Sequence, residues 1–323
     1  MAQLTLSQCI QGFLLDKRAQ RLSPHTIADY SNAYRKLAAW LDADPPLAGI
    51  TADQIRAFLA ELGTVPQPMP GVAARPPRPL SKKTILNIHT ALSALWTWCC
   101  NEGIADRHII RDIPRPKPEK RAIQPFSRAQ IRDLLNACDR SRLYGRPGKR
   151  PSDHGRPTAQ RDRAILYLLL DTGLRASELC GLHGYHVDLK SQHVQVFGKG
   201  SKERVLPISP RTAKALWKYL ASDPERREGD PLFTSRGGAP LTASALLQMI
   251  RRLGDRAGVP GCHPHRFRHT FAISFLRNGG NVYALQAMLG HSSLDMVRRY
   301  LALAQTDVDQ AHRTASPVAN WRL

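Results

Sequence analysis

Three histidines and two arginines lie close together near the carboxyl end of the chain, in "GCHPHRFRHTFAISFLRNGG", residues 261–280. They are His263, His265 and His269, with Arg266 and Arg268 among them. Pro264 suits the first turn of a helix. In such a helix His265, Arg268 and His269 share one face, because side chains three and four positions apart are neighbours. One face can serve one ligand.

This face could bind a metal, bind a phosphate or simply cover a helix surface. Two histidines at i and i+4 can bind zinc, but an arginine beside them would repel the metal, and no glutamate stands between them as the base of a metalloprotease. A phosphate site needs fixed cations and a group that moves a proton, which arginine and histidine supply. In isolation the segment leaves a polar helix face open as well.

Four other segments carry residues that would complete a phosphate site. They are "TGLRASELCGL" with Arg175 and Glu178, "GKGSKER" with Lys199, "LGHSS" with His291 and "MVRRYLA" with Tyr300. Taken alone, each has an ordinary structural interpretation: a helix start, a turn lysine, a cap at a helix junction and an amphipathic core residue. Their joint occurrence favours chemistry on a phosphate.

The charge of the chain indicates a polyanionic partner. The 323 residues include 47 Lys and Arg against 26 Asp and Glu, for a formal net charge of +21 and an isoelectric point near 10.3. Residues 1–119 hold 14 basic and 10 acidic side chains, whereas residues 120–323 hold 33 and 16. Such a charge is typical of nucleic-acid-binding proteins, although charge alone does not separate DNA from RNA or anionic lipid.

Composition narrows the class of protein further. A hydrophobic content of 42% fits a globular protein that is long enough for two domains. No apolar run reaches the roughly 20 residues of a membrane span, and the first ten residues lack the pattern of a signal peptide. The six cysteines are scattered, so neither a disulfide framework nor paired zinc ligands are indicated. We therefore expect a cytoplasmic protein with free thiols and no membrane partner.

The elements that position these residues divide into two domains. Residues 1–112 predict a bundle of four amphipathic helices, because apolar residues recur every three to four positions, as in "SPHTIADYSNAYRKLAAWL". The prolines of residues 64–80 predict a long exposed loop within this bundle. Residues 113–125, rich in proline and basic side chains, predict a linker, and a second domain follows over 126–323.

The second domain is predicted to be mainly helical, with one β-hairpin. "HVQVFGKGSKERVLPI" alternates apolar residues on both sides of a Gly-Lys-Gly-Ser turn, as hairpins do, which places Lys199 at the tip. Helices are expected before the hairpin, in "RDRAILYLLLDTG", and throughout the chain from Leu241 onward. Glycine, proline and arginine over 141–161 are typical of a flexible basic insertion.

In this order and with these separations, the motifs resemble those of the tyrosine recombinase (phage integrase) family, most closely its Xer-like members. The resemblance covers nearly the whole chain. It implies a fold class that is mainly α with a small β-sheet, in which a helical core-binding domain and an α+β catalytic domain form a C-shaped clamp around duplex DNA. It also implies a site-specific recombinase that cleaves and rejoins DNA and needs no metal, nucleotide or other cofactor.

The resemblance assigns roles to individual residues. Arg175 and Arg268 resemble the paired arginines that hold the scissile phosphate, and Tyr300 resembles the nucleophile that forms a 3′-phosphotyrosyl link. Lys199 resembles the general acid for the leaving 5′-oxygen, His265 a proton-transfer and positioning group, and His291 a hydrogen-bond donor to the phosphate. Glu178 is expected to hold the Arg175 side of the site. His263, Arg266 and His269 match no catalytic role, and we expect them in surface, helix and packing duties.

The resemblance also implies an assembly. Strand exchange between two duplexes needs four active sites, so we expect a homotetramer on a specific DNA site, or an assembly with a partner recombinase. The long segments 64–80 and 141–161 make a mobile-element integrase as plausible as a resolver of chromosome dimers. A type IB topoisomerase with similar residues and a DNA-binding regulator on a recombinase fold are the alternatives. No motif predicts the target sequence.

Overall fold

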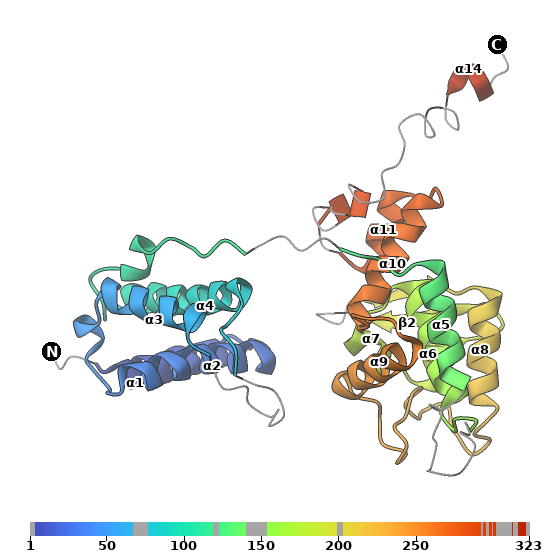
Figure 1. The fold of residues 1–323 in the computed structure, drawn as a ribbon, viewed down its shortest axis with the longest axis horizontal. Coiled ribbons are helices and arrows are strands. Elements are labelled where there is room, and N and C mark those ends of the chain that lie inside the picture. Colours follow the sequence, from blue (N-terminus) through green and yellow to red (C-terminus); the bar gives the residue numbers. More distant parts are fainter. Residues whose placement is uncertain are drawn as a thin grey trace, which may run out of the picture. The chain divides into compact units, whose positions relative to one another are not determined.

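The chain forms two compact units, residues 1–121 and 122–323, called unit 1 and unit 2 below. The computed structural model describes residues 4–66, 77–118, 123–139, 154–198 and 203–291, and beyond them 293–294, 297–298, 300–301, 312 and 316–320. Figure 1 shows the elements of both units. The division falls within residues 113–125, where the composition predicts a linker.

Unit 1 is a helical bundle. Its helices are α1 (Leu6–Ala19), α2 (Pro24–Leu41), α3 (Ala52–Thr64) and α4 (Lys82–Asn101), with the short 3-10 helices η1 (Leu47–Gly49) and η2 (Ile109–Asp112) in its connections. A hydroxyl side chain precedes each of the four α-helices and accepts a hydrogen bond from the backbone N–H three residues later; the four are Thr5, Ser23, Thr51 and Ser81. These caps satisfy N–H groups that have no partner within the helix.

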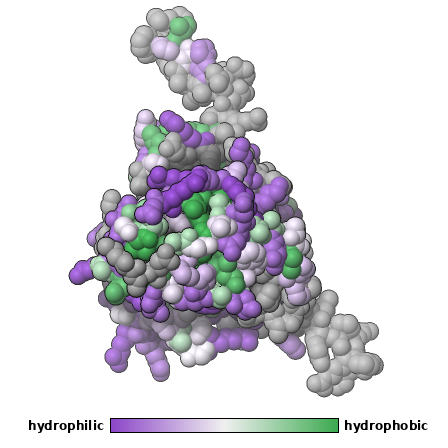
Figure 2. All heavy atoms as spheres, turned by 90° about the vertical axis from the view of Figure 1, so that its left-hand side faces the viewer, coloured by the Kyte–Doolittle hydropathy of each residue, from purple (hydrophilic) through white to green (hydrophobic). Residues whose placement is uncertain are grey.

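The core of unit 1 is filled by aromatic and aliphatic side chains from all four helices, among them Phe13, Tyr34, Phe58 and Trp96. The Phe13 ring lies edge-on to that of Tyr34, and the Tyr34 hydroxyl donates to the Ala91 carbonyl at 2.9 Å. Figure 2 shows hydrophilic residues over most of the surface in view, with hydrophobic residues confined to smaller areas. The apolar stripes of the helices therefore face inward, as their periodicity predicts.

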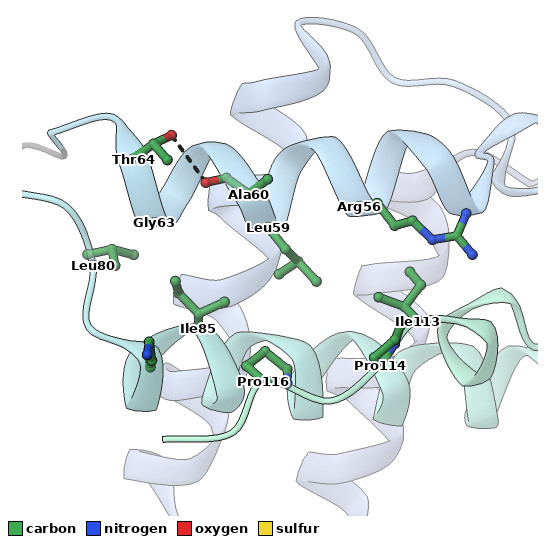
Figure 3. Close-up of a pocket in the computed structure, with 11 residues that line it drawn as sticks. Arg56, Leu59, Ala60, Gly63, Thr64, Leu80, Ile85, Ile113, Pro114 and Pro116 are labelled. Atoms are coloured by element: carbon green, nitrogen blue, oxygen red, sulfur yellow. Dashed lines mark hydrogen bonds between the residues drawn. The ribbon is translucent and has the colours of Figure 1, made fainter. Parts of the chain in front are cut away.

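A mostly apolar groove of about 470 Å³ lies along α3 and the start of α4 (Figure 3). Leu59, Ile85 and Ile113 contribute apolar surface to it, and Arg56 and Lys82 contribute positive charge. All of its lining residues belong to unit 1, so it is separate from the candidate site described below.

Unit 2 is mainly helical. Its helices are α5 (Arg128–Asp139), α6 (Ala159–Thr172), α7 (Ala176–Cys180), η3 (Gly184–His186), α8 (Pro210–Leu220), α9 (Ala243–Ala257), α10 (Pro264–Arg277), α11 (Val282–Leu289) and α14 (Pro317–Asn320). Helix α6 packs against α5, α8 and α10, and its residues Ala164, Ile165, Leu168 and Leu169 are fully buried. Helix α8 was not predicted from the sequence, although Ser209 and Pro210 give it a cap and a proline in the first turn.

The sheet of unit 2 has three antiparallel strands in the order β1 (Val187–Asp188), β2 (His193–Phe197) and β3 (Glu203–Pro207). Val194 lies opposite Leu206, and Val196 opposite Arg204. Val194, Val196 and Leu206 are buried, so one face of the hairpin joins the core. The predicted hairpin is present in its strands, while its turn over 199–202, with Lys199, lies outside the described residues.

Two apolar clusters pack against opposite ends of α10. Phe267 joins the large core formed with α5, α6, α8, α9 and the sheet, whereas Phe271 joins a smaller cluster with Leu285, Leu289 and Tyr300. This double packing fixes the rotation of α10 and hence the direction of the polar side chains between the two phenylalanines.

The structure is mainly helical with a small antiparallel sheet, as the sequence predicts. Most of the predicted loop over 64–80, most of the insertion over 141–161 and most of the chain after residue 301 lie outside the described residues. Within the part that the structure describes, no helix is long and apolar enough to cross a membrane.

Candidate active site

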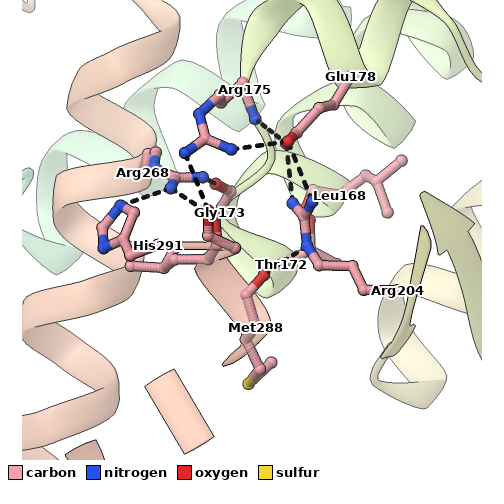
Figure 4. A network of polar contacts seen from close by, with 11 residues as sticks. Leu168, Thr172, Gly173, Arg175, Glu178, Arg204, Arg268, Met288 and His291 are labelled. Atoms are coloured by element: carbon pink, nitrogen blue, oxygen red, sulfur yellow. Dashed lines mark hydrogen bonds and ion pairs between the residues drawn. The ribbon is translucent and has the colours of Figure 1, made fainter. Parts of the chain in front are cut away.

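Residues far apart in the sequence converge at one end of α10. Figure 4 shows Arg175, Glu178, Arg204, Arg268 and His291 joined by polar contacts. Arg175 comes just before α7, Glu178 lies within it, Arg204 is on β3, Arg268 is on α10 and His291 follows α11. Four separate elements and their connections thus build a single cluster.

Arg268 is the buried centre of this cluster, with only 1% of its surface exposed. Its Nη1 donates to the Gly173 carbonyl at 2.8 Å, and its Nη2 donates to the Leu289 carbonyl at 2.7 Å and to Nε2 of His291 at 2.7 Å. Among the described residues, these bonds engage three of the five guanidinium N–H groups and leave two for a further acceptor.

Gly173 allows this close approach. It ends α6 in the left-handed region, with φ of +62°, where glycine is favoured. A Cβ at this position would lie 2.5 Å from Cδ1 of Phe271 and 2.9 Å from Cδ2 of Leu289. A larger residue would therefore force the side chains of Phe271 and Leu289 to shift, next to the carbonyl that Arg268 contacts.

The electrostatics of the cluster favour an anion. Burial, and next the neighbouring charge of Arg175, lower the pKa of Arg268 to about 10. Arg268 still carries its charge at neutral pH, close to a second cation that repels it. A bound phosphate would offset both effects, because guanidinium groups form short, charge-assisted hydrogen bonds with its oxygens.

Glu178 holds two arginines at once. Its Oε1 accepts from Nη1 of Arg175 at 2.8 Å and from Nη1 of Arg204 at 3.0 Å, and its Oε2 accepts from Nη2 of Arg204 at 2.9 Å. Burial opposes the charge of this carboxyl, but the hydrogen bonds from Arg204 and from the Arg175 backbone outweigh it, and the pKa of Glu178 is lowered.

The carbonyls at the end of α11 fix the other sides of these arginines. Nε of Arg204 donates to the Met288 carbonyl at 2.8 Å, and Nη2 of Arg175 donates to the Gly290 carbonyl at 3.4 Å. The Arg175 side chain is nevertheless 39% exposed, against 13% for Arg204. Arg175 therefore offers donors to a ligand, whereas Arg204 acts as part of the scaffold.

His291 is a neutral acceptor in this arrangement. Burial, and next the charges of Arg268 and Arg175, lower its pKa to about 4. Because Nε2 accepts from Arg268, the proton of the neutral ring lies on Nδ1. Within the described residues, Nδ1 is a buried atom without a hydrogen-bond partner.

Tyr300 lies against α10 and is 3% exposed. Its hydroxyl lies 3.0 Å from Nδ1 of His269, and its ring is parallel to that of His291, with centroids 6.4 Å apart. His265 is exposed, and its ring meets that of His269 edge to face at a centroid distance of 4.2 Å. His265, His269, His291 and Tyr300 therefore form a layer beside the arginines.

The other residues of the opening stretch support α10. Nδ1 of His263 accepts from the Arg266 backbone N–H at 3.2 Å and so caps the helix. The Arg266 guanidinium lies over the Phe126 ring, 4.0 Å from its centroid. Among the residues that the structure describes, no group of three or more His, Cys, Asp or Glu side chains could hold a metal ion.

Two residues of this site were not predicted from the sequence. His269 was expected in packing, yet it contacts the Tyr300 hydroxyl. Arg204 was given no role, yet it ties the hairpin to Glu178 and α11. The spacing of His269 from His265, four positions earlier, signalled a shared face in the first case, but nothing in the strand pattern singled out Arg204.

Comparison with known proteins shows the family to which the chain belongs. The model of the phage integrase family matches residues 126–307, more than half of the chain and the whole of the arginine cluster. The chain belongs to the phage integrase family. Its predicted enzyme class, tyrosine recombinase, is confirmed with it.

Curated relatives in this family match along almost the full chain. The tyrosine recombinase XerC of Xylella fastidiosa strain 9a5c is 30% identical over 318 residues, which cover 97% of this chain and 98% of the relative. XerC of Alcanivorax borkumensis is 29% identical over 320 residues, which cover 98% and 95%. These alignments therefore cover both unit 1 and unit 2.

Solved structures show the same fold. The Tn1549 transposon integrase in complex with transposon right end DNA has a TM-score of 0.70 at 20% identity, covering 97% of this chain and 99% of that one. A lambda integrase dimer bound to a COC′ core site has a TM-score of 0.69 at 16% identity, covering 92% and 77%. These likenesses confirm the predicted fold class, mainly α with a small β-sheet.

Proposed function

We propose that this protein is a site-specific recombinase that cleaves and rejoins duplex DNA through a 3′-phosphotyrosyl intermediate. The convergence of Arg175, Arg268 and His291 beside the Tyr300 hydroxyl carries the proposal. The net charge of +21 and the DNA complexes of the transposon and lambda integrases support DNA as the substrate.

The two arginines bind the scissile phosphate. Arg268 offers its two remaining N–H groups from a buried position, and Arg175, whose side chain is 39% exposed, offers N–H groups of its own. Both keep their charge while the phosphorus becomes five-coordinate, and their positions are set by protein contacts before DNA arrives. This preorganisation stabilises the transition state more than a mobile side chain can.

His291 acts as a hydrogen-bond donor to the same phosphate. In the DNA-free protein its Nε2 accepts from Arg268, so the ring cannot donate through that nitrogen. A phosphate between Arg175 and Arg268 offsets the positive charges that lower the pKa of His291, which favours a second proton on the ring. The doubly protonated ring then donates through Nε2 while Arg268 turns its N–H to the phosphate.

The chemical step exchanges one phosphodiester for another. The Tyr300 oxygen forms a bond to phosphorus and passes its proton to His265 as the bond to the 5′-oxygen breaks, and Lys199 supplies the proton of the 5′-hydroxyl that leaves. His265 takes part in proton transfer and positioning, and Glu178 keeps Arg175 in place. Attack by a 5′-hydroxyl on the phosphotyrosine reverses the step, so the reaction needs no high-energy cofactor.

Strand exchange between two sites requires four such active sites. We therefore propose a tetramer on DNA, in which unit 1 and unit 2 of each protomer grip the duplex as a clamp. The XerH recombinase, solved bound to a palindromic difH substrate as a post-cleavage complex, has a TM-score of 0.66 at 19% identity, covering 95% of this chain and 84% of that chain. Its two-fold symmetric substrate supports an arrangement in which protomers bind paired half-sites.

The test begins by finding the DNA site. Genomic fragments bound by the protein are protected from nuclease digestion and sequenced, and the recovered site is rebuilt as a nicked duplex that traps a covalent intermediate. We expect the wild-type chain to form a protein–DNA adduct that survives a denaturing gel. Tyr300→Phe should abolish the adduct and leave affinity nearly unchanged, because one hydroxyl is a small part of a large interface.

Two outcomes would contradict the proposal. An adduct of normal yield with Tyr300→Phe would remove Tyr300 as the nucleophile. Relaxation of supercoiled plasmids without any exchange between two recovered sites would replace a recombinase by a topoisomerase. Arg161→Lys provides a control for general damage, because Arg161 lies in unit 2 and contacts Asp162 and Thr234 rather than the cluster.

A further inference from the structure

We infer that His269 is a positioning residue for Tyr300. Its Nδ1 accepts a hydrogen bond from the Tyr300 hydroxyl and thereby directs the lone pairs of the Tyr300 oxygen at the phosphorus. This inference rests on the proposed function, in which Tyr300 is the nucleophile. It adds a role to a residue that follows Arg268 directly in the sequence and lies on the same helix.

The contact is well defined. Nδ1 of His269 and Oη of Tyr300 are 3.0 Å apart, and the two ring centroids are 5.6 Å apart with the planes tilted by 56°. Tyr300 is 3% exposed within the small apolar cluster around Phe271. The phenol is therefore held at both ends, by the cluster around its ring and by His269 at its oxygen.

The direction of this hydrogen bond suits a nucleophile. A phenol oxygen has one proton and two acceptor lone pairs. When Oη donates its proton to Nδ1, both lone pairs remain available for attack on phosphorus. When Nδ1–H donates to Oη instead, one lone pair is occupied. An acceptor at Nδ1 therefore prepares the oxygen for bond formation, and this requires the ring proton on Nε2.

The environment keeps His269 in the form that accepts. Burial, and next the charges of His265 and His263 in their protonated forms, lower the pKa of His269 to about 4, and Arg268 adds to this. The ring is therefore neutral at physiological pH, with one nitrogen free to accept. So low a pKa also makes Nδ1 a weak proton acceptor, which favours holding the hydroxyl over removing its proton.

His265 and α10 restrain the His269 ring. The His265 ring meets it edge to face, with centroids 4.2 Å apart and an angle of 70°. The backbone beneath it is fixed because Arg268 and Phe267 are buried on either side of the helix turn. A ring confined in this way can transmit a fixed position to Tyr300, 31 residues later in the sequence.

Two substitutions separate holding from filling space. His269→Asn places Oδ1 close to the position of Nδ1, so it can still accept the tyrosine proton, whereas His269→Leu fills similar space without an acceptor. Single-turnover cleavage is measured with saturating full-length protein on the nicked duplex that carries the recovered site. A misplacement of about 1 Å costs about 100-fold in rate, so we expect a loss of that size for His269→Leu and cleavage close to wild type for His269→Asn.

The melting temperature and the affinity for the same duplex are measured for both variants. We expect the Asn and Leu variants to have the same melting temperature and the same affinity. Equal, severe losses for Asn and Leu with normal DNA affinity would overturn the inference, because a holding role predicts rescue by asparagine. Wild-type cleavage by His269→Leu would also overturn it. Tyr300→Phe is run beside them: if its adduct persists, the proposed function fails, whereas its loss together with an unaffected His269→Leu defeats only the present inference.

Discussion

Arg204 on β3 and Glu178 on α7 form a two-pronged ion pair, with N···O distances of 3.0 and 2.9 Å. The same carboxylate accepts a hydrogen bond from Nη1 of Arg175 at 2.8 Å. The strand that leads away from the Lys199 turn is thereby connected to the arginine that faces the ligand. A shift of the hairpin moves Arg204, and Glu178 passes the shift to Arg175.

We expect Arg204→Lys to slow DNA cleavage by about tenfold or more, because lysine cannot form the planar fork that orients Glu178, and small misplacements are costly in rate. Affinity for the recovered site should fall less, since Arg204 itself is 13% exposed and directs its nitrogens to protein acceptors. Single-turnover cleavage and equilibrium binding on the same duplex measure the two effects.

Arg161→Lys is the matched control for this experiment. Arg161 is 12% exposed and donates twice to Asp162 in the same unit, without touching Glu178. Both variants should lose about 1–3 kcal/mol of folding stability through weakened charged hydrogen bonds. If the two slow cleavage equally, loss of stability explains the effect and the connection through Glu178 has no special role.

The histidines of the site predict acid sensitivity of unit 2. The folded-state pKa values of His269 and His291 are about 4, below the ordinary value of 6.5. The unfolded chain therefore binds more protons between these values, and the free energy of unfolding falls as pH drops from 6.5 towards 4. Above 6.5 this contribution is fully present. Thermal unfolding followed from pH 7.5 to 5 measures it.

Comparison with His269→Asn isolates the histidine contribution from that of the carboxylates. Asparagine does not titrate, so the melting temperature of the variant should fall less between pH 7.5 and 5 than that of the wild type. Parallel curves for the two proteins would mean that His269 has the same proton affinity in the folded and unfolded chains.

Lys199→Ala should slow cleavage of ordinary DNA severely. A substrate with sulfur at the 5′-bridging position has a leaving group that needs no proton, so the same variant should cleave it at nearly the wild-type rate. Cleavage of both substrates by wild type and variant is compared on the recovered site. Equal defects on the two substrates would assign Lys199 to phosphate binding instead.

The end of the chain is predicted to join protomers. Val318, on the short helix α14, is 62% exposed, and we expect the apolar residues of "VANWRL", residues 318–323, to anchor this segment to a neighbouring protomer. Deletion of residues 306–323 should preserve binding of one protomer to a half-site but reduce cooperative assembly and recombination. Gel-shift titration and a two-site recombination assay measure these steps. Undiminished tetramer formation and recombination would show that the tail acts only within its own protomer.

Local patterns predicted most of the elements. Ser23 and Pro24 marked the start of α2, and the alternation around the Gly-Lys-Gly-Ser turn marked β2 and β3. Each signal lies within a few residues of the structure it specifies. The strand β1 has two residues, too few to show alternation, and the helix α8 was missed although its cap and proline were present.

Residues of the candidate site could be predicted only where they belong to a recognisable sequence motif. Arg175, Arg268, His291 and Tyr300 belong to recognisable motifs, but their mutual distances depend on the close packing of α10 and α11 against Gly173. Contacts such as that between His269 and Tyr300 join residues on different elements. No periodicity within either element reports such a partner, so the pair emerges only with the tertiary structure.

The burial of Tyr300 bears on fidelity. The arginine cluster and Tyr300 are both in position before DNA binds, but with Tyr300 as the nucleophile its 3% exposure means that neighbouring side chains cover the attacking oxygen. Uncovering the phenol where it lies costs about 25 cal/mol for each Å² of apolar surface exposed. We expect the contacts along a complete recombination site to supply that free energy, so that a wrong sequence is bound and released uncut. Discrimination then resides in the rate of cutting, and genomic DNA remains intact while the protein samples it.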